Sequence, residues 1–277
     1  MAINLTTKFS KQIDERFVQK ALGMNAFHSK YDAEFIGAKT VKIYSIDTSP
    51  LKDYDKDGGY QRYGELTELQ DTVQELTLTQ EKALNYSIDG VYNSQQLFIK
   101  QVPHTLAMHL DEVVIPAYDS YVFGVITAGA GTTKELTLTA ENIYDEILTA
   151  QAELTNNNVP KAGRVLYMTP NKINLLKKSE AFAPATDSVV GAIRLAGQVG
   201  QVDGLPIVEV PEATMGVGNE FVLLHNSAVV APVTINHIQV HQNPLGIYGS
   251  VVQAVFVYDA FILANKTKAV YVQKVTA

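Results

Sequence analysis

Acidic side chains alternate in residues 52–60, which read KDYDKDGGY. Asp53, Asp55 and Asp57, with a glycine after them, match the first half of an EF-hand loop, in which oxygen ligands hold Ca²⁺. A complete EF-hand needs a bidentate glutamate at the twelfth loop position, and counting from Asp53 that position is Gly64. We therefore interpret the stretch as a polar turn inside a long loop, since Asp and Gly favour tight turns.

Histidines occur in two pairs that could in principle bind a metal. His104 and His109 are five residues apart, which is about 140° around a helix and a poor geometry for a shared ligand. His237 and His241 share one face of a predicted strand, but no third ligand with recognisable spacing stands nearby. We interpret all four as surface or interface histidines and expect no metal site.

Motifs of catalysis and cofactor binding are incomplete. The segment GAGTTKE (129–135) lacks the G-x-x-x-x-G-K-[ST] spacing of a phosphate-binding loop, so we interpret it as a turn that ends a helix. No G-x-S-x-G elbow occurs, and no obvious set of carboxylates or histidines is present. We expect no cofactor and no catalytic residues.

Composition narrows the function further. The 277 residues are 46% hydrophobic, which is enough for one large domain or two closely joined ones. The chain contains no Cys, so disulfides and Cys-based zinc fingers are excluded. A net charge of −7 argues against a broad basic surface for nucleic acid. Without a long apolar run or a secretory signal, we expect no membrane partner and synthesis in the cytoplasm.

The N-terminal third is unusual for its long connection. Residues 41–47 and 74–89 alternate as strands do, and between them Thr48–Val73 has few strong aliphatic side chains. A connection of this length is usually functional, and it should become ordered by lying across another surface. Residues 1–40 read as an extended arm with a short amphipathic segment at 11–23.

The strongest helical signal covers residues 94–126. Pro103 suits a first turn, and Pro116 predicts a bend rather than a stop. Thr139 is the predicted N-cap of the next helix, within residues 137–160. A short helix is predicted at 169–179, and strands are predicted at 164–169, 203–211, 220–232, 235–244, 250–264 and 269–275.

The order of these pieces resembles the major capsid proteins of tailed bacteriophages, which have the Hong Kong 97-type fold. The similarity rests on VVIPAYDSYVFGVI (113–126), TAENIYDEILTAQAELTNNNVPKAGRVLYMTP (139–170), GQVDGLPIVEVP (200–211), FVLLHNSAVVAPV (221–233) and GSVVQAVFVYDAFILANKTKAVYV (249–272). It implies an α+β chain with an N-terminal arm, an extended E-loop hairpin, a long spine helix, a peripheral β-sheet and an α/β axial domain. The implied boundaries are 1–40 for the arm, 41–92 for the E-loop hairpin, 93–130 with 232–262 for the peripheral domain, and 131–231 with 263–277 for the axial domain.

In that family the E-loop lies over the adjacent subunit, so the resemblance implies that residues 52–69 make intersubunit contacts. The candidate charge contacts are Lys52, Asp53, Asp55, Asp57 and Arg62, and the candidate aromatic anchors are Tyr54, Tyr60 and Tyr63. Arm residues Lys11, Arg16 and Phe17 are further interface candidates. Lysine–asparagine crosslinks occur in some members, but nothing activates Lys52 or Lys56 toward Asn243 or Asn265, so we expect none.

The implied function is a head protein that forms hexamers and pentamers in an icosahedral shell around phage double-stranded DNA. The DNA contacts would be nonspecific. Because no scaffolding extension precedes the arm, we expect a separate scaffolding protein, with a portal and an optional decoration protein as further partners. Assembly would take place in the bacterial cytoplasm. The alternatives are the shell of a bacterial encapsulating nanocompartment and, from another class, an enzyme with a β-rich domain.

Overall fold

A computed structural model of the protein describes residues 34–35, 39–46, 48–57, 62–66, 68–95, 101–179 and 198–276. Lys11, Arg16, Phe17 and Tyr60 therefore lie outside the described residues. The strands are β1 (Thr40–Ile46), β2 (Asp71–Thr77), β3 (Gln80–Asp89), β4 (Thr132–Glu135), β5 (Arg164–Met168), β6 (Gln198–Val202), β7 (Leu205–Glu209), β8 (Asn219–His225), β9 (Val229–Val230), β10 (Val233–Gln242), β11 (Gly249–Tyr258), β12 (Phe261–Ile262) and β13 (Val270–Lys274). The helices are α1 (Gly90–Gln95), α2 (Val102–His109), α3 (Ile115–Ala128), α4 (Ile143–Asn156), α5 (Pro170–Lys178) and α7 (Glu212–Met215), with a π-helical turn η3 (Leu110–Val114) and 3₁₀ turns η4 (Asn226–Ala228) and η5 (Ala264–Ala269).

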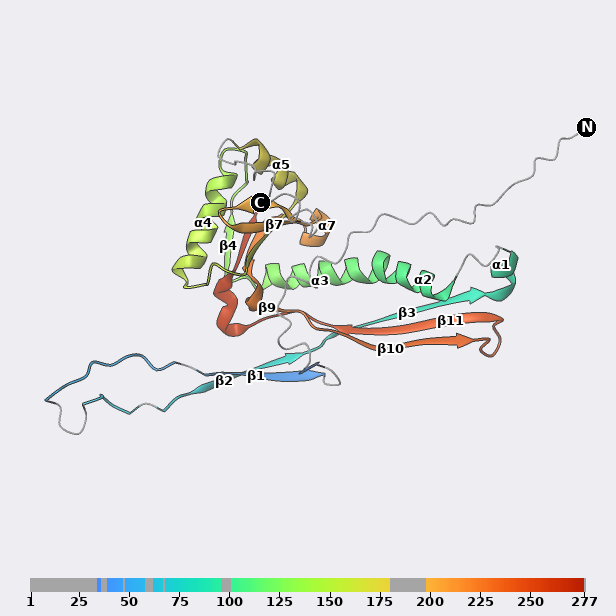
Figure 1. Cartoon of the computed structure of the whole chain (residues 1–277), viewed down its shortest axis with the longest axis horizontal. Helices are drawn as coiled ribbons and strands as arrows, with labels where there is room; N and C mark the ends of the chain where they lie inside the picture. Colours follow the sequence, from blue (N-terminus) through green and yellow to red (C-terminus); the bar gives the residue numbers. More distant parts are fainter. Residues whose placement is uncertain are drawn as a thin grey trace, which may run out of the picture.

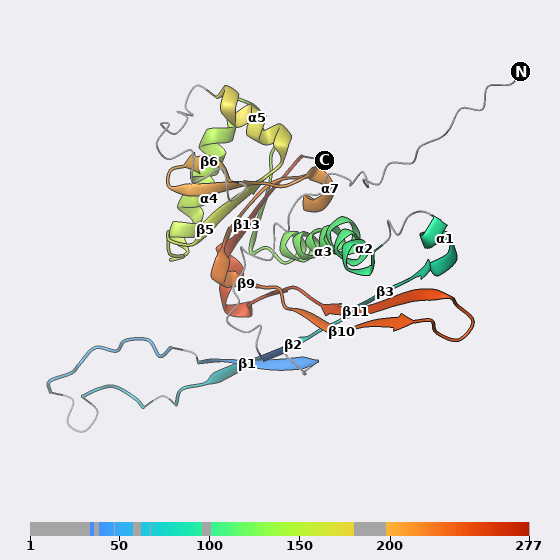
Figure 2. The same ribbon diagram turned by 45° about the vertical axis from the view of Figure 1, so that its right-hand side comes forward.

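A six-stranded sheet, in the order β4-β13-β8-β5-β7-β6, lies in the upper part of the molecule as seen in Figure 1. Two of its pairings are parallel, β4 with β13 and β5 with β7, and the others are antiparallel. Helices α4 and α5 pack on one face, and α3 with α7 pack on the other (Figure 2). The mixed sheet is therefore covered on both sides.

Strand β8 shows why the sequence folds this way. Phe221 and Leu223 enter the core under α4 and α5, while Val222 and Leu224 enter the core under α3. A strand that is buried on both faces reads as a continuous apolar run rather than an alternating one. The predicted strand at 220–232 is confirmed in its first half, but it is interrupted by η4 before β9.

A continuous helix of three parts, α2, η3 and α3, runs from residue 102 to 128 and is called the long helix below (Figure 1). Pro103 occupies the first turn of α2, as predicted. The helix continues through Pro116, also as predicted, and the irregularity beside it is a π-helical turn. The N–H of Ile115 bonds to the carbonyl of Leu110, five residues back. The predicted single helix at 94–126 is corrected at its start, because α1 is a separate helix at residues 90–95.

A three-stranded antiparallel sheet in the order β10-β11-β3 lies beneath the long helix (Figures 1 and 2). Val252, Ala254 and Phe256 are buried on the helix side of β11. The Tyr86 ring of β3 stacks on His109 of α2, with centroids 4.5 Å apart. This sheet and the long helix therefore share one core with the neighbouring face of the six-stranded sheet.

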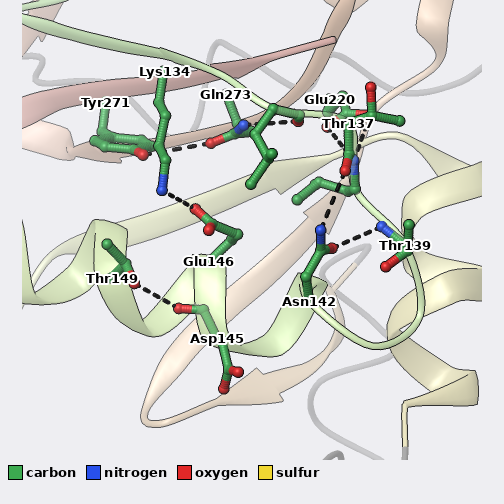
Figure 3. Close-up of polar contacts among 12 residues, drawn as sticks. Lys134, Thr137, Thr139, Asn142, Asp145, Glu146, Thr149, Glu220, Tyr271 and Gln273 are labelled. Carbon is green, nitrogen blue, oxygen red and sulfur yellow. Dashed lines mark hydrogen bonds and ion pairs between the residues drawn. The ribbon is translucent and has the colours of Figure 1, made fainter. Parts of the chain in front are cut away.

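Two sequence predictions near the six-stranded sheet were wrong. Residues 132–135 form β4 rather than a turn, because the chain returns beside β13 directly after the long helix. Helix α4 begins at Ile143, and Thr139 is not its N-cap. Asn142 holds this entry turn instead, since its Oδ1 accepts from the N–H of Thr139 at 2.7 Å and its Nδ2 donates to Thr137 (Figure 3).

A hairpin of β6 and β7 replaces the single strand predicted at 203–211. Its turn residues Asp203 and Gly204 have φ values of 46° and 77°. Positive φ at both central positions defines the type I′ turn, for which Asp-Gly is a preferred pair. The signal was thus present in the sequence.

Buried side chains of Glu220 and Gln273 tie the segment before α4 to the sheet (Figure 3). The Glu220 carboxylate accepts from the N–H of Leu138 and pairs with Lys172 at 2.5 Å. Gln273 donates to the carbonyl of Leu136 at 2.9 Å. Backbone groups of an irregular segment are thereby satisfied away from water.

Arg164 closes the other end of α4. The residue is 1% exposed, and its guanidinium donates to the carbonyls of Gln151, Val159 and Pro160 and to the hydroxyl of Thr155, at 2.5–3.1 Å. A cation at a helix C-terminus also favours the helix dipole. Burial lowers the pKa of Arg164, which reflects the desolvation that these bonds offset.

Candidate intersubunit surfaces

Strands β1 and β2 form an antiparallel pair in which Thr40 faces Thr77 and Ile46 faces Asp71. With its connection, residues 47–70, this pair is called the hairpin below; it projects from the body of the molecule (Figures 1 and 2). Alternation along β1 buries Val41 and Ile43, leaves Ser45 half-buried on the same face, and exposes the other side chains. The hairpin therefore has one face toward the body and one face without cover.

Polar and aromatic contacts across the connection bring several of the predicted interface residues together. The amide of Asp55 bonds to the carbonyl of Arg62 at 3.0 Å, and the Lys52 ammonium donates to the carbonyl of Glu65. Tyr54 and Tyr63 pack edge to face, with ring centroids 5.1 Å apart. The two sides of the connection are thus held beside each other over this stretch.

The aspartate repeat has a structural role in this connection. Asp55 Oδ1 accepts a hydrogen bond from the N–H of Asp57 at 2.9 Å, which is an Asx turn. Asp53 and Arg62 are exposed beside it. Within the described residues, no three His, Cys, Asp or Glu side chains gather as a metal site would require.

Exposed apolar side chains on the hairpin are its most unusual property. They are Tyr44, Ile46, Leu51, Tyr54, Tyr63, Leu66, Leu69 and Val73, which together are called the hairpin surface below. Leu51 and Leu66 are fully exposed. Large exposed apolar patches are typical of surfaces that bind another molecule. The sequence prediction named the tyrosines and charges but missed the leucines, whose only signal was their isolation in a charged loop.

Apolar packing holds the base of the hairpin. Val41, Ile43, Leu76 and Leu78 join a buried cluster with side chains from β9, β11 and the segment after β12. Phe35 stacks on Phe261 at the edge of this cluster, with centroids 6.1 Å apart. The base is therefore part of the folded subunit, whereas the remainder of the hairpin is not covered by it.

Hydrogen bonds between the base of the hairpin and the segment that follows β11 accompany this packing. Gln74 of β2 donates to the carbonyl of Ile262 at 3.2 Å and accepts from the N–H of Ala264 at 2.9 Å. Asp259 accepts from both the N–H and the hydroxyl of Thr79, between β2 and β3. Asp259 also accepts from the Tyr121 hydroxyl; burial, and then this bond, raise the pKa of Tyr121.

A second exposed apolar group lies at the opposite end of the molecule, at the β10–β11 turn and α1 (Figure 1). It comprises Val91, Tyr92, Leu245, Ile247 and Tyr248. The turn is fixed to α1 because the N–H of Gly90 bonds to the carbonyl of Tyr248 at 2.8 Å. The subunit thus presents apolar side chains at both of its ends.

His241 and Asn243 lie at the end of β10, and Asn265 lies in η5 beside β1. The side chain of His237 lies outside the described set, and His241 borders a hollow on the outer face of the three-stranded sheet. Asn243 bonds to the N–H of Gly249, and Asn265 bonds to Ser45. Over the described part of the chain, the helices are too short or too polar to cross a membrane.

Solved structures with the same architecture come from phage capsids. The structure from Mycobacterium phage Che8 is 21% identical, with a TM-score of 0.76 over 97% of this chain and 96% of its own. The mature capsid of bacteriophage PhiM1 is 14% identical, with a TM-score of 0.69 over 99% of this chain and 92% of its own. The chain has the Hong Kong 97-type capsid fold. The predicted resemblance and α+β class are thereby confirmed.

A weaker likeness relates this capsid fold to a virus-like particle from Pyrococcus furiosus. That structure is 12% identical, with a TM-score of 0.52 over 85% of this chain and 86% of its own. Neither the family models nor the curated proteins include a match to the sequence.

Proposed function

We propose that this chain is a structural capsid protein whose copies associate into the closed shell of a tailed phage. The observation that supports this proposal is the likeness to capsid structures. It extends over nearly the whole chain, the projecting hairpin included. A hairpin with an uncovered apolar surface is poorly suited to an isolated subunit. Contact with a neighbouring copy would remove that apolar area from water.

Head-to-tail contacts that close by rotation give rings, and we propose hexamers and pentamers that tile an icosahedral shell around double-stranded DNA. In this arrangement, residues 131–231 and 263–277 form the axial domain, and residues 93–130 and 232–262 form the peripheral domain. The hairpin lies over the adjacent subunit, with Lys52, Tyr54 and Tyr63 in the contact. The net charge of −7 suits a wall that packs DNA without binding it tightly.

The further partners that we propose are a separate scaffolding protein, a portal and, in some particles, a decoration protein. Assembly would occur in the cytoplasm of a bacterial host, and the finished location would be the virion. The likeness to the Pyrococcus furiosus particle supports one alternative, the shell of a nanocompartment. An enzyme cargo in place of DNA would identify that alternative.

The test is to make the chain in bacteria with and without its neighbouring genes, and to examine the product by negative-stain microscopy and light scattering. We expect closed shells or rings of one repeated chain. A monomer or dimer that persists with all neighbours present would overturn the proposal and favour the enzyme alternative. Nucleic-acid content and particle diameter would separate a phage head from a nanocompartment.

A matched pair of variants tests the hairpin surface itself. Leu66 and Val217 are both fully exposed, in the hairpin and in the turn before β8 respectively. Neither Leu66→Asp nor Val217→Asp should alter the circular dichroism of the subunit, since surface changes cost little. We expect Leu66→Asp to abolish shells and Val217→Asp to retain them. An equal loss in both would contradict the special role of the hairpin.

A further inference from the structure

Asp259 is a buried carboxylate with an unusual set of partners. The residue is 3% exposed and follows the end of β11. Its Oδ2 accepts from the N–H and the hydroxyl of Thr79 at 2.8 and 2.7 Å. Its Oδ1 accepts from the Tyr121 hydroxyl at 2.8 Å and from the N–H of Ala260 at 2.7 Å. Four donors therefore converge on one side chain that is removed from water.

These partners belong to parts of the molecule that have separate tasks. Thr79 lies in the two-residue connection between β2 and β3, which is the root of the hairpin. Tyr121 lies in the second turn of α3, in the long helix. Asp259 thus joins the root of the hairpin to the long helix through a single carboxylate.

The residues after Asp259 repeat this connection. Ile262 and Ala264 bond to Gln74 of β2, and Asn265 bonds to Ser45 of β1. Ile262 also lies against the end of α3, where a Cβ added to Gly129 would meet its side chain at 2.9 Å. Both strands of the hairpin and the end of the long helix therefore contact the same seven-residue segment, 259–265.

We propose that Asp259 is a positioning residue that fixes the direction of the hairpin relative to the long helix. The proposal rests on the proposed function, in which the hairpin must reach a neighbouring subunit. The apolar cluster at the hairpin base contributes non-directional attraction, whereas hydrogen bonds to a buried carboxylate weaken steeply when their angles change.

Geometry explains why this direction matters. Strand β2 has seven residues, so the strands alone carry the hairpin about 24 Å from its root at about 3.4 Å per residue. A rotation of about 10° at the root displaces the far end of those strands by about 4 Å. A displacement of that size would remove the hairpin from a complementary surface, because close packing tolerates little misfit.

The long helix offers a matched pair of tyrosines for the test. Tyr121 and Tyr118 both pack edge to face on Tyr258, with centroids 5.7 and 5.4 Å apart. Tyr121 donates to Asp259, whereas Tyr118 donates to the carbonyl of Ala231 at 2.6 Å. Tyr121→Phe and Tyr118→Phe each remove one hydroxyl and keep the ring. Only the first removes a donor from Asp259.

The root offers a second pair, Thr79→Val and Thr79→Ser. Valine keeps the shape and loses the hydroxyl, and serine keeps the hydroxyl. Tyr121→Phe and Thr79→Val combined complete a double-mutant cycle.

The direction of the hairpin can be measured on unassembled subunits by double electron–electron resonance, which gives the distance distribution between two spin labels. The chain has no Cys, so spin labels can be attached only at introduced sites. Val73→Cys on β2 and Val113→Cys on the long helix place them at two exposed positions. Shell yield is measured separately, in chains without labels.

We expect Tyr121→Phe and Thr79→Val to broaden the distance distribution and to reduce shell yield about tenfold. Tyr118→Phe and Thr79→Ser should resemble the parent chain in both measurements. The double variant should lose less shell yield than the two single variants combined, because both substitutions act through one carboxylate.

Three results would overturn the inference: an unchanged distance distribution in Tyr121→Phe, equal broadening in Tyr118→Phe, or a changed distribution with full shell yield. Failure of the proposed function is distinguishable. In that case the parent chain forms no shells with its neighbours present, while the labelled subunits still report whether Asp259 sets the hairpin direction.

Discussion

Arg164→Lys should destabilise the subunit, although it conserves the charge. The guanidinium donates from three nitrogens: Nε to the carbonyl of Pro160, Nη1 to that of Gln151, and Nη2 to that of Val159. A lysine has one nitrogen and cannot reach all of these positions. At least two hydrogen bonds are lost, at about 1.5 kcal/mol each for a charged donor, which gives about 3 kcal/mol.

The measurement is urea unfolding of the unassembled subunit, followed by far-ultraviolet circular dichroism. With a slope of about 3 kcal/mol per molar urea, the midpoint should fall by about 1 M. Arg62→Lys is the matched control, since Arg62 lies in the exposed connection of the hairpin and its replacement should change stability by less than about 0.5 kcal/mol. If Arg164→Lys and Arg62→Lys unfold at the same urea concentration, the closure of α4 by Arg164 has been misjudged.

Three further predictions concern other parts of the fold. Burial lowers the pKa of His225 below 6.5, so the unfolded chain binds the proton more readily and stability should fall as the pH drops below about 6.5. In thermal unfolding, the melting temperature of His225→Gln should depend less steeply on pH than that of the parent chain. Equal slopes in the two chains would refute this. Gly249→Ala should lower the free energy of unfolding by more than about 2 kcal/mol, because φ is 142° and a Cβ there would collide with the carbonyl oxygen of Ile88. An unchanged melting temperature would contradict this prediction. Lys172→Met should lower the free energy of unfolding by about 3 kcal/mol, because it leaves the buried Glu220 without its cation. Adding Glu220→Gln to the same chain should restore part of that free energy, which chemical unfolding can measure.

Local patterns were sufficient where the chain is buried on a regular period. The apolar runs of β5 and β8 predicted strands, and Pro103 was predicted to lie in a first helical turn, as it does in α2. Predictions failed where a single side chain replaces a regular signal. Asn142 rather than Thr139 organises the entry to α4, through bonds to the backbone on both sides of the turn.

The candidate intersubunit surface was also only partly predictable from the sequence. The long charged connection predicted a segment that becomes ordered across another surface, because it cannot bury enough apolar area by itself. The projecting hairpin was predicted from the family resemblance alone. Asp259 could not be found from the sequence, since its partners Tyr121 and Thr79 are 138 and 180 residues away. A lone aspartate after a strand has no local pattern that distinguishes it from a surface residue.

Strand β13 has a consequence for the synthesis of the protein. It lies between β4 and β8, and its residues enter the cores on both faces of the six-stranded sheet. While the ribosome is still translating upstream of Val270, the sheet therefore has a gap between two of its strands. Pairing of such distant segments is slow, and incomplete chains expose apolar surface. We expect that chains without β13 are recognised by chaperones, so that only subunits with a complete sheet become available for association.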